Sequence, residues 1–150
     1  MKAMVLKSAD EVELADMRRP ATDNGETLIR VSHSGICGTD LKIFRGAIRV
    51  NHPLVMGHEM IGEMVEGKSI GPRVIVDPVY FCGGCYLCNH GQMHLCTNGG
   101  LFGRDRDGGF AEYFAAPPGS VYELPDDIAG EAPLIQVLTT CLHGHRLARI

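Results

Sequence analysis

The sequence predicts a mainly β domain, an antiparallel barrel or sandwich with long loops and a few short helices. Short apolar or β-branched segments bounded by turn-forming residues dominate the first 125 residues. Nineteen glycines and eight prolines are scattered between these segments. The strand–helix alternation of a doubly wound fold is missing, and no G-x-G-x-x-G fingerprint stands between a strand and a helix.

Seven segments have the residue types of strands and end at turn-forming residues. In chain order they are residues 1–6, 12–14, 28–31, 61–65, 73–76, 110–115 and 121–124.

Two segments are predicted as helices. Residues 39–45 form a short helix with Thr39 as its N-cap and Asp40 in its first turn, where a carboxylate is favourable. Residues 131–150 form a longer helix, because apolar side chains recur at spacings of three and four. These side chains are Leu134, Val137, Leu138, Cys141 and Leu142, with His145 in register.

Length and composition indicate one ordinary globular domain of 150 residues, with 45% hydrophobic and 21% charged residues. The formal net charge of −4 argues against a nucleic-acid surface, which usually carries a basic stripe. No apolar run is long enough to cross a membrane, and the first residues lack the pattern of an export signal. We therefore expect a cytoplasmic protein whose cysteines are reduced and available for metal.

Four of the six cysteines follow the spacing C-x2-C-x2-C-x7-C, at Cys82, Cys85, Cys88 and Cys96. Thiolates this close form a tetrahedral cage, and closed four-sulfur shells usually hold structural zinc. An iron–sulfur cluster is the alternative, because bacterial ferredoxins begin with the same C-x2-C-x2-C. Their fourth cysteine comes after three residues and precedes a proline, whereas here it comes after seven. The spacing favours zinc.

A second set of candidate ligands lies upstream. Cys37 stands in the segment G-I-C-G-T-D, and His58 and Glu59 stand in G-H-E. A sulfur, an imidazole and a carboxylate suit a metal that keeps an open position for chemistry. Taken singly, Cys37 would be a small core residue, and His58 and Glu59 would be solvated turn residues.

Taken together, these residues resemble the zinc-containing medium-chain alcohol dehydrogenases, a family that includes sorbitol and threonine dehydrogenases. The motifs occur in the family's order and span almost the whole chain. The resemblance implies that residues 1–150 form a GroES-like, partly open barrel with a zinc-binding loop lobe, the catalytic domain. It also implies a Rossmann domain for NAD or NADP, and the chain stops about where that domain should begin. The matching motifs are GICGTD at 35–40, GHEMIG at 57–62, VIVDP at 74–78, the four cysteines and GGFAEY at 108–113.

The resemblance also implies roles for single residues. Cys37 and His58 would bind a catalytic zinc, and Glu59 would be a third ligand or a carboxylate that exchanges with substrate and water. Thr39 would relay the proton of the substrate hydroxyl, and Asp40 would orient the site. The four clustered cysteines would hold a second, structural zinc.

Among the departures from the family pattern, two concern candidate site residues. Gln136 stands where the family places a further zinc-site residue, usually Glu, Asp or Cys, and a neutral amide is a poor zinc ligand. Water or Glu59 would then occupy that coordination position of the zinc. Alternatively, Gln136 would hydrogen-bond the zinc-bound water, or it would have no role in the site. Lys42 replaces a histidine that in many relatives passes the proton onward or touches the cofactor ribose. It would contact ribose or phosphate, or be a solvated helix lysine.

The predicted function is the catalytic part of an NAD(P)-dependent dehydrogenase, in which zinc stabilises the alkoxide of a small alcohol or polyol before hydride transfer. The chain alone is expected to be inactive, because the hydride acceptor has no site in it. The resemblance allows a homo-oligomer of the full-length enzyme. A non-enzymatic zinc-binding interaction module is the alternative, and it leaves Cys37, His58 and Glu59 without a purpose.

Overall fold

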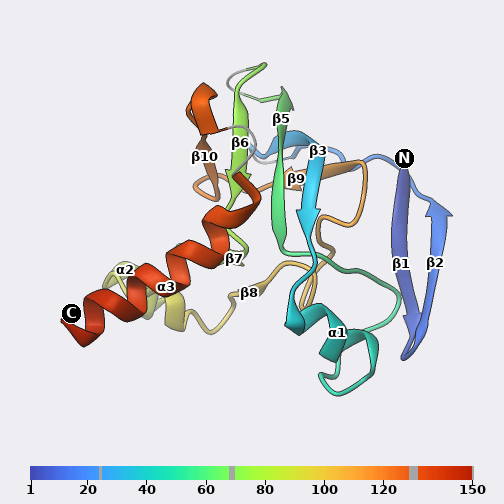
Figure 1. Cartoon of the computed structure of the whole chain (residues 1–150), viewed down its shortest axis with the longest axis horizontal. Helices are drawn as coiled ribbons and strands as arrows, with labels where there is room; N and C mark the ends of the chain where they lie inside the picture. Colours follow the sequence, from blue (N-terminus) through green and yellow to red (C-terminus); the bar gives the residue numbers. More distant parts are fainter. Residues whose placement is uncertain (24, 68–69, 129–131, 150) are drawn as a thin grey trace.

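The computed structural model describes residues 1–150 except 24, 68–69, 129–131 and 150 (Figure 1). Its core is a five-stranded sheet in the order β10-β6-β5-β3-β9, with every neighbouring pair antiparallel. The strands of this sheet are β3 (Thr27–Gly35), β5 (Glu59–Glu66), β6 (Arg73–Val76), β9 (Tyr113–Ala116) and β10 (Val121–Glu123).

Two smaller sheets complete the β structure of the part of the chain that the structure describes. The first has the order β2-β1-β4 and the second pairs β7 with β8, again antiparallel. Figure 1 shows β1 and β2 beside the N-terminus, away from the C-terminal helix. The prediction of a mainly β domain is confirmed. The strands of these sheets are β1 (Lys2–Ser8), β2 (Glu11–Asp16), β4 (Leu54–Val55), β7 (Val79–Tyr80) and β8 (Gly100–Leu101).

The hydrophobic core lies along the five-stranded sheet, because its strands place apolar side chains toward the interior at intervals of two. Phe102 packs edge-on against Phe114 and is tilted against Tyr80. A second cluster packs α1 against β1 and β4 through Ile43 and Leu6, which are fully buried. The main cluster comprises Ile29, Met60, Met64, Val74, Val76, Tyr80, Phe102, Phe114 and Ala116.

The pairing of β3 with β5 sets the geometry of the site. Its register shifts between Leu28 and Ile29 and again between Val31 and His33. Such bulges bend and twist a strand. Beyond the second shift, Gly35 at the end of β3 lies opposite Glu59 at the start of β5. The residues that follow β3 and precede β5 therefore meet at one end of the sheet.

The described residues contain three α-helices: α1 (Gly38–Phe44), α2 (Tyr86–Asn89) and α3 (Ile135–Ala148). Figure 1 shows α3 projecting from the β structure toward the C-terminus. Its Val137, Leu138 and Leu142 are each more than half exposed, so the predicted apolar stripe does not enter the core of the described chain. None of the described helices is long and apolar enough to cross a lipid bilayer. Short 3-10 turns lie at Met93–Leu95, Asp126–Ile128 and Ala132–Leu134.

Several predicted boundaries are corrected. The N-cap of α1 is Cys37 and not Thr39, because Asp40 reaches back to the Cys37 amide and starts the helix two residues earlier. Residues 110–112 precede β9 instead of forming part of it. The C-terminal helix begins only at Ile135, after a 3-10 turn. Residues 131 and 150, the predicted ends of this helix, lie outside the described residues.

Candidate metal centres

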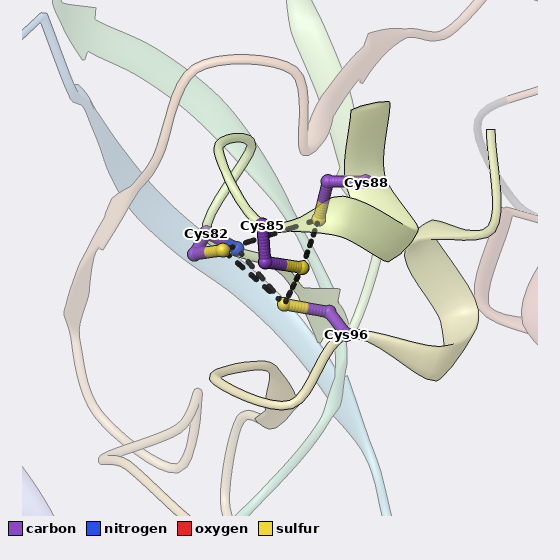
Figure 2. Close-up of side chains that lie close together, drawn as sticks. All are labelled: Cys82, Cys85, Cys88 and Cys96. Carbon is purple, nitrogen blue, oxygen red and sulfur yellow. Dashed lines mark hydrogen bonds between the residues drawn. The ribbon is translucent and has the colours of Figure 1, made fainter. Parts of the chain in front are cut away.

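The four clustered cysteines converge on one point at the tip of a loop lobe (Figure 2). Cys85 is the N-cap of α2, Cys88 lies within α2, and Cys96 follows the next 3-10 turn. Cys82 is brought to the same point by a turn at Gly83, whose φ of 72° favours glycine. Short-range structure therefore assembles all four thiols.

The sulfur positions fit a single tetrahedral ion. The Sγ–Sγ distances are 3.5 Å for Cys85–Cys88 and Cys82–Cys96, 3.9 Å for Cys85–Cys96 and 4.0 Å for Cys82–Cys88. Zinc–sulfur bonds of ~2.3 Å in a tetrahedron separate the sulfurs by about 3.8 Å. An iron–sulfur cluster would spread the thiolates around several metal and sulfide atoms. The lobe is a structural zinc site.

The thiols of this lobe differ in acidity before metal binds. Backbone N–H groups of Gly84 and Cys85 lower the pKa of Cys82 to about 6. Removal from water and the adjacent sulfurs of Cys85 and Cys96 raise the pKa of Cys88 to about 12. Because zinc binds thiolates, its entry must displace the proton that Cys88 retains.

A second group of ligands, Cys37, His58 and Glu59, lies at the end of the β3–β5 pair. One ligand atom from each residue lies within 4.8 Å of the others. Cys37 follows β3 at the start of α1, where the Thr39 backbone N–H lowers the pKa of the Cys37 thiol. Three donors of these types fit a zinc ion that keeps its fourth position open.

Asp40 links two of these ligands. One carboxylate oxygen accepts a hydrogen bond of 2.8 Å from the backbone N–H of Cys37, and the other lies 3.3 Å from Nδ1 of His58. Asp40 and His58 are only 2% and 8% exposed, so water does not screen the pair. The Asp40 carboxylate raises the pKa of His58 to about 9, against the opposing effect of burial. With Nδ1 facing Asp40, Nε2 is the nitrogen that can bind metal.

Two glycines shape the space around the ligands. A Cβ atom at Gly35 would collide with the carboxylate of Glu59, so the absence of a side chain on β3 gives Glu59 its place. Gly57, with φ of 93°, carries the chain into His58, and a Cβ there would enter the Phe110 ring. Neither glycine was predicted from the sequence to shape the site. Each is the first residue of a family motif, Gly35 of GICGTD and Gly57 of GHEMIG, and this was the signal that could have identified them.

The ligand group opens into a cavity of about 450 Å³. It is lined by Cys37, His58 and Glu59 together with Gln136 and other residues of α3. A ligand at the metal centre would therefore lie between the barrel and the first turns of α3.

The remaining predicted site residues occupy different surroundings. Thr39 lies half-buried in the first turn of α1, and its hydroxyl contacts the Cys37 thiol. Lys42 is exposed one turn further along the same helix. Gln136 directs its side-chain nitrogen to two backbone oxygens, of His58 at 3.0 Å and of Val76 at 3.1 Å.

Comparison with known protein families agrees with this geometry. Residues 23–126 match the family model of the alcohol dehydrogenase GroES-like domain, which covers more than half of the chain. The chain belongs to the zinc-containing medium-chain alcohol dehydrogenase family. The resemblance inferred from the motifs is confirmed.

Individual members of the alcohol dehydrogenase family align over most of the chain. L-threonine 3-dehydrogenase of Pyrococcus abyssi is 40% identical over 143 residues, which cover 89% of this chain and 41% of that protein. Galactitol-1-phosphate dehydrogenase of Escherichia coli superimposes with a TM-score of 0.91 and 29% identity, over 99% of this chain and 45% of that one. The rspB alcohol dehydrogenase of Escherichia coli CFT073, in complex with NADH, has a TM-score of 0.83 and 34% identity, over 90% and 42%.

The chain spans less than half of the length of the curated relatives it matches. The shared part is the zinc-dependent dehydrogenase catalytic domain, with its four-cysteine site and its Cys–His–Glu group.

Proposed function

We propose that this chain is the catalytic domain of an NAD- or NADP-linked zinc dehydrogenase that oxidises a small alcohol or polyol. The observation that carries the proposal is the Cys37–His58–Glu59 group, which lies in a cavity and is separate from the four-cysteine lobe. A structural zinc alone would need only the four cysteines. The second group has the mixed ligands and the open side of a catalytic centre.

Each residue of this centre has a distinct part in holding the substrate. Cys37 and His58 would hold the metal, and Glu59 would supply the third ligand, a carboxylate oxygen, or withdraw as substrate enters. Zinc, when bound, acts as a Lewis acid that lowers the pKa of the alcohol hydroxyl. Asp40 keeps the imidazole of His58 in one orientation, because its carboxylate faces Nδ1 at 3.3 Å.

Thr39 is proposed to receive the proton of the substrate hydroxyl. Its own hydroxyl is beside the Cys37 thiol, so it is close to the substrate oxygen and can accept one proton while passing on another. Lys42 lies three residues further on the same face of α1. Its ammonium group would pass the proton to solvent or contact a phosphate of the cofactor. The alcohol loses this proton and a hydride, and becomes a carbonyl compound as NAD(P)⁺ becomes NAD(P)H.

The hydride acceptor is proposed to bind to a further domain. The family relative rspB was solved with NADH, and the chain covers 42% of it. On this view residues 1–150 alone have no dehydrogenase activity. A cytoplasmic location is proposed because all six cysteines, each within the described residues, are free thiols.

Metal analysis tests the proposal directly. Wild-type protein prepared without chelator should bind two zinc ions per chain, one for each ligand group. Cys37→Ala and His58→Ala should each bind one zinc and keep a wild-type circular dichroism spectrum. His145→Ala is the matched control, because His145 belongs to neither ligand group, does not line the cavity beside Cys37 and His58, and should leave two zinc ions bound.

The alternative functions give different results in the same experiment. A single zinc in the wild-type protein would support the non-enzymatic interaction module. If both ligand variants still bind two zinc ions, Cys37 and His58 are not ligands of the second zinc. Visible absorption from bound iron would favour an iron–sulfur protein.

A further inference from the structure

The side chain of Gln136 joins the first turn of α3 to the backbone beside the catalytic ligands. Nε2 donates one hydrogen bond of 3.0 Å to the carbonyl of His58 and one of 3.1 Å to the carbonyl of Val76. These partners lie 78 and 60 residues earlier in the chain. One amide thus connects α3 with the segment that enters β5 and with the end of β6.

The partners determine how the amide is oriented. Backbone carbonyls only accept hydrogen bonds, so the nitrogen of Gln136 must face them and the oxygen must face away. Both amide hydrogens are then used. An ionised Glu or Asp at this position has no hydrogen to donate and would leave both carbonyls without this partner. Gln136 therefore makes contacts that a Glu or Asp side chain at this position could not make.

The position of these bonds matters for the metal centre. The carbonyl of His58 belongs to the peptide that joins His58 to Glu59, and both of these side chains are candidate ligands. Few other contacts hold α3 at this point, since none of its described side chains is buried. Ile135, next to Gln136, is partly buried and packs against the cluster that contains Ile61 and Ile75.

We propose that Gln136 is a positioning residue of the catalytic metal centre and not one of its ligands. It holds the His58–Glu59 peptide in place from α3, so that the imidazole and the carboxylate stay within reach of one ion. The neutral amide also leaves one thiolate and one carboxylate as the charged ligands, which balance a divalent ion. This inference rests on the proposed function only in requiring that Cys37, His58 and Glu59 bind zinc.

The test compares Gln136→Met with Thr139→Val. Methionine has a similar length and no hydrogen to donate, so both bonds to the barrel are lost. Thr139 lies one turn later, and its hydroxyl donates at 2.7 Å to the Gln136 backbone carbonyl within α3. Its removal therefore deletes a hydrogen bond of the same helix turn without breaking a bond to β5 or β6.

Zinc affinity of each site is measured by competition with a chelator, with Cys37→Ala as the background that contains only the four-cysteine site. We expect Gln136→Met to bind the catalytic zinc about 10- to 100-fold more weakly, the usual effect of losing an outer contact to a ligand. Affinity at the four-cysteine site should not change. Hydrogen exchange of the amides of residues 57–61 should become faster. Thr139→Val should match the wild type in all three measurements.

Wild-type affinity for catalytic zinc in Gln136→Met would overturn the inference, even if exchange in α3 increased, because the side chain would then only anchor the helix. If Gln136→Met does not fold, Gln136→Asn serves instead, since it keeps the amide but is too short to span both carbonyls. The same zinc measurement decides. A wild-type protein with no zinc at Cys37, His58 and Glu59 would contradict the proposed function itself, so the two failures are distinguishable.

Discussion

Nδ1 of His58 lies 3.3 Å from the carboxylate of Asp40, and both side chains are buried. The other oxygen of the same carboxylate accepts the backbone N–H of Cys37. A single acidic residue in the first turn of α1 therefore contacts two metal ligands, one that follows β3 and one that precedes β5.

Asp40→Asn should weaken zinc binding at the catalytic centre about 10- to 100-fold, because a neutral amide raises the basicity of the imidazole less than a carboxylate does. In the metal-free protein, the pKa of His58 should fall from about 9 toward its ordinary value. Chelator competition and NMR titration of the imidazole measure the two effects. Asp16→Asn, which removes a carboxylate from an exposed ion pair with Lys2, should change neither.

The stability of the metal-free protein should depend on pH through His58. Its pKa is raised on folding to about 9, so folding favours the protonated imidazole. The stabilisation is complete below the unfolded value of ~6.5 and is lost as the pH rises through about 9. Urea unfolding of wild type and His58→Gln measures it. The difference in unfolding free energy should be larger near pH ~6 than near pH ~10. A difference that grows with pH would contradict the role of Asp40.

Gly35→Ala should reduce zinc binding at the catalytic centre and leave the four-cysteine site intact. The added Cβ would collide with the carboxylate of Glu59 and push this ligand away from Cys37 and His58. Gly144→Ala is the matched control, because no atom lies within 4 Å of a Cβ at this position in α3. It should leave both sites loaded and stabilise the helix by up to ~1 kcal/mol. Equal zinc content in the two variants would show that Glu59 does not need this space.

Zinc binding at the four-cysteine site should release protons at neutral pH. The pKa of Cys88 is raised to about 12, so this thiol is still protonated in the metal-free protein, whereas Cys82, with a pKa of about 6, is mostly ionised. Titration calorimetry in buffers of different ionisation enthalpy counts the released protons. Cys37→Ala should keep this release, because it does not alter the lobe. A binding enthalpy independent of the buffer would contradict the prediction.

A strand could be predicted from the sequence where its own residues show the apolar, β-branched pattern of a strand. The predicted segment 73–76 coincides with β6, whose four residues are branched or amphipathic and mostly buried. The strands β4, β7 and β8 have two residues each, too few to show an alternation in sequence. They exist because a partner strand offers hydrogen bonds to them, as Val5 and Leu6 of β1 do to β4.

The two metal centres also differ in how far their ligands could be predicted from the sequence. The four cysteines lie within one loop, so their spacing already indicates that the sulfurs can meet. Cys37 and His58 meet only because bulged pairing of β3 with β5 brings together segments that are distant along the chain. Their joint assignment from sequence depended on family motifs and not on spacing.

The sequence by itself determined the class of fold, the family and the four cysteine ligands of one metal site, because each depends on local patterns or on ligands close in the chain. Tertiary structure decided that the Asp40 carboxylate faces His58, that Glu59 occupies the space over Gly35 and that Gln136 bonds to the His58 backbone. It also left the apolar residues of α3 exposed, although their spacing resembled that of a buried helix face. Such relationships depend on the register of strands and on packing between segments. The periodicity of a single segment predicts neither of these.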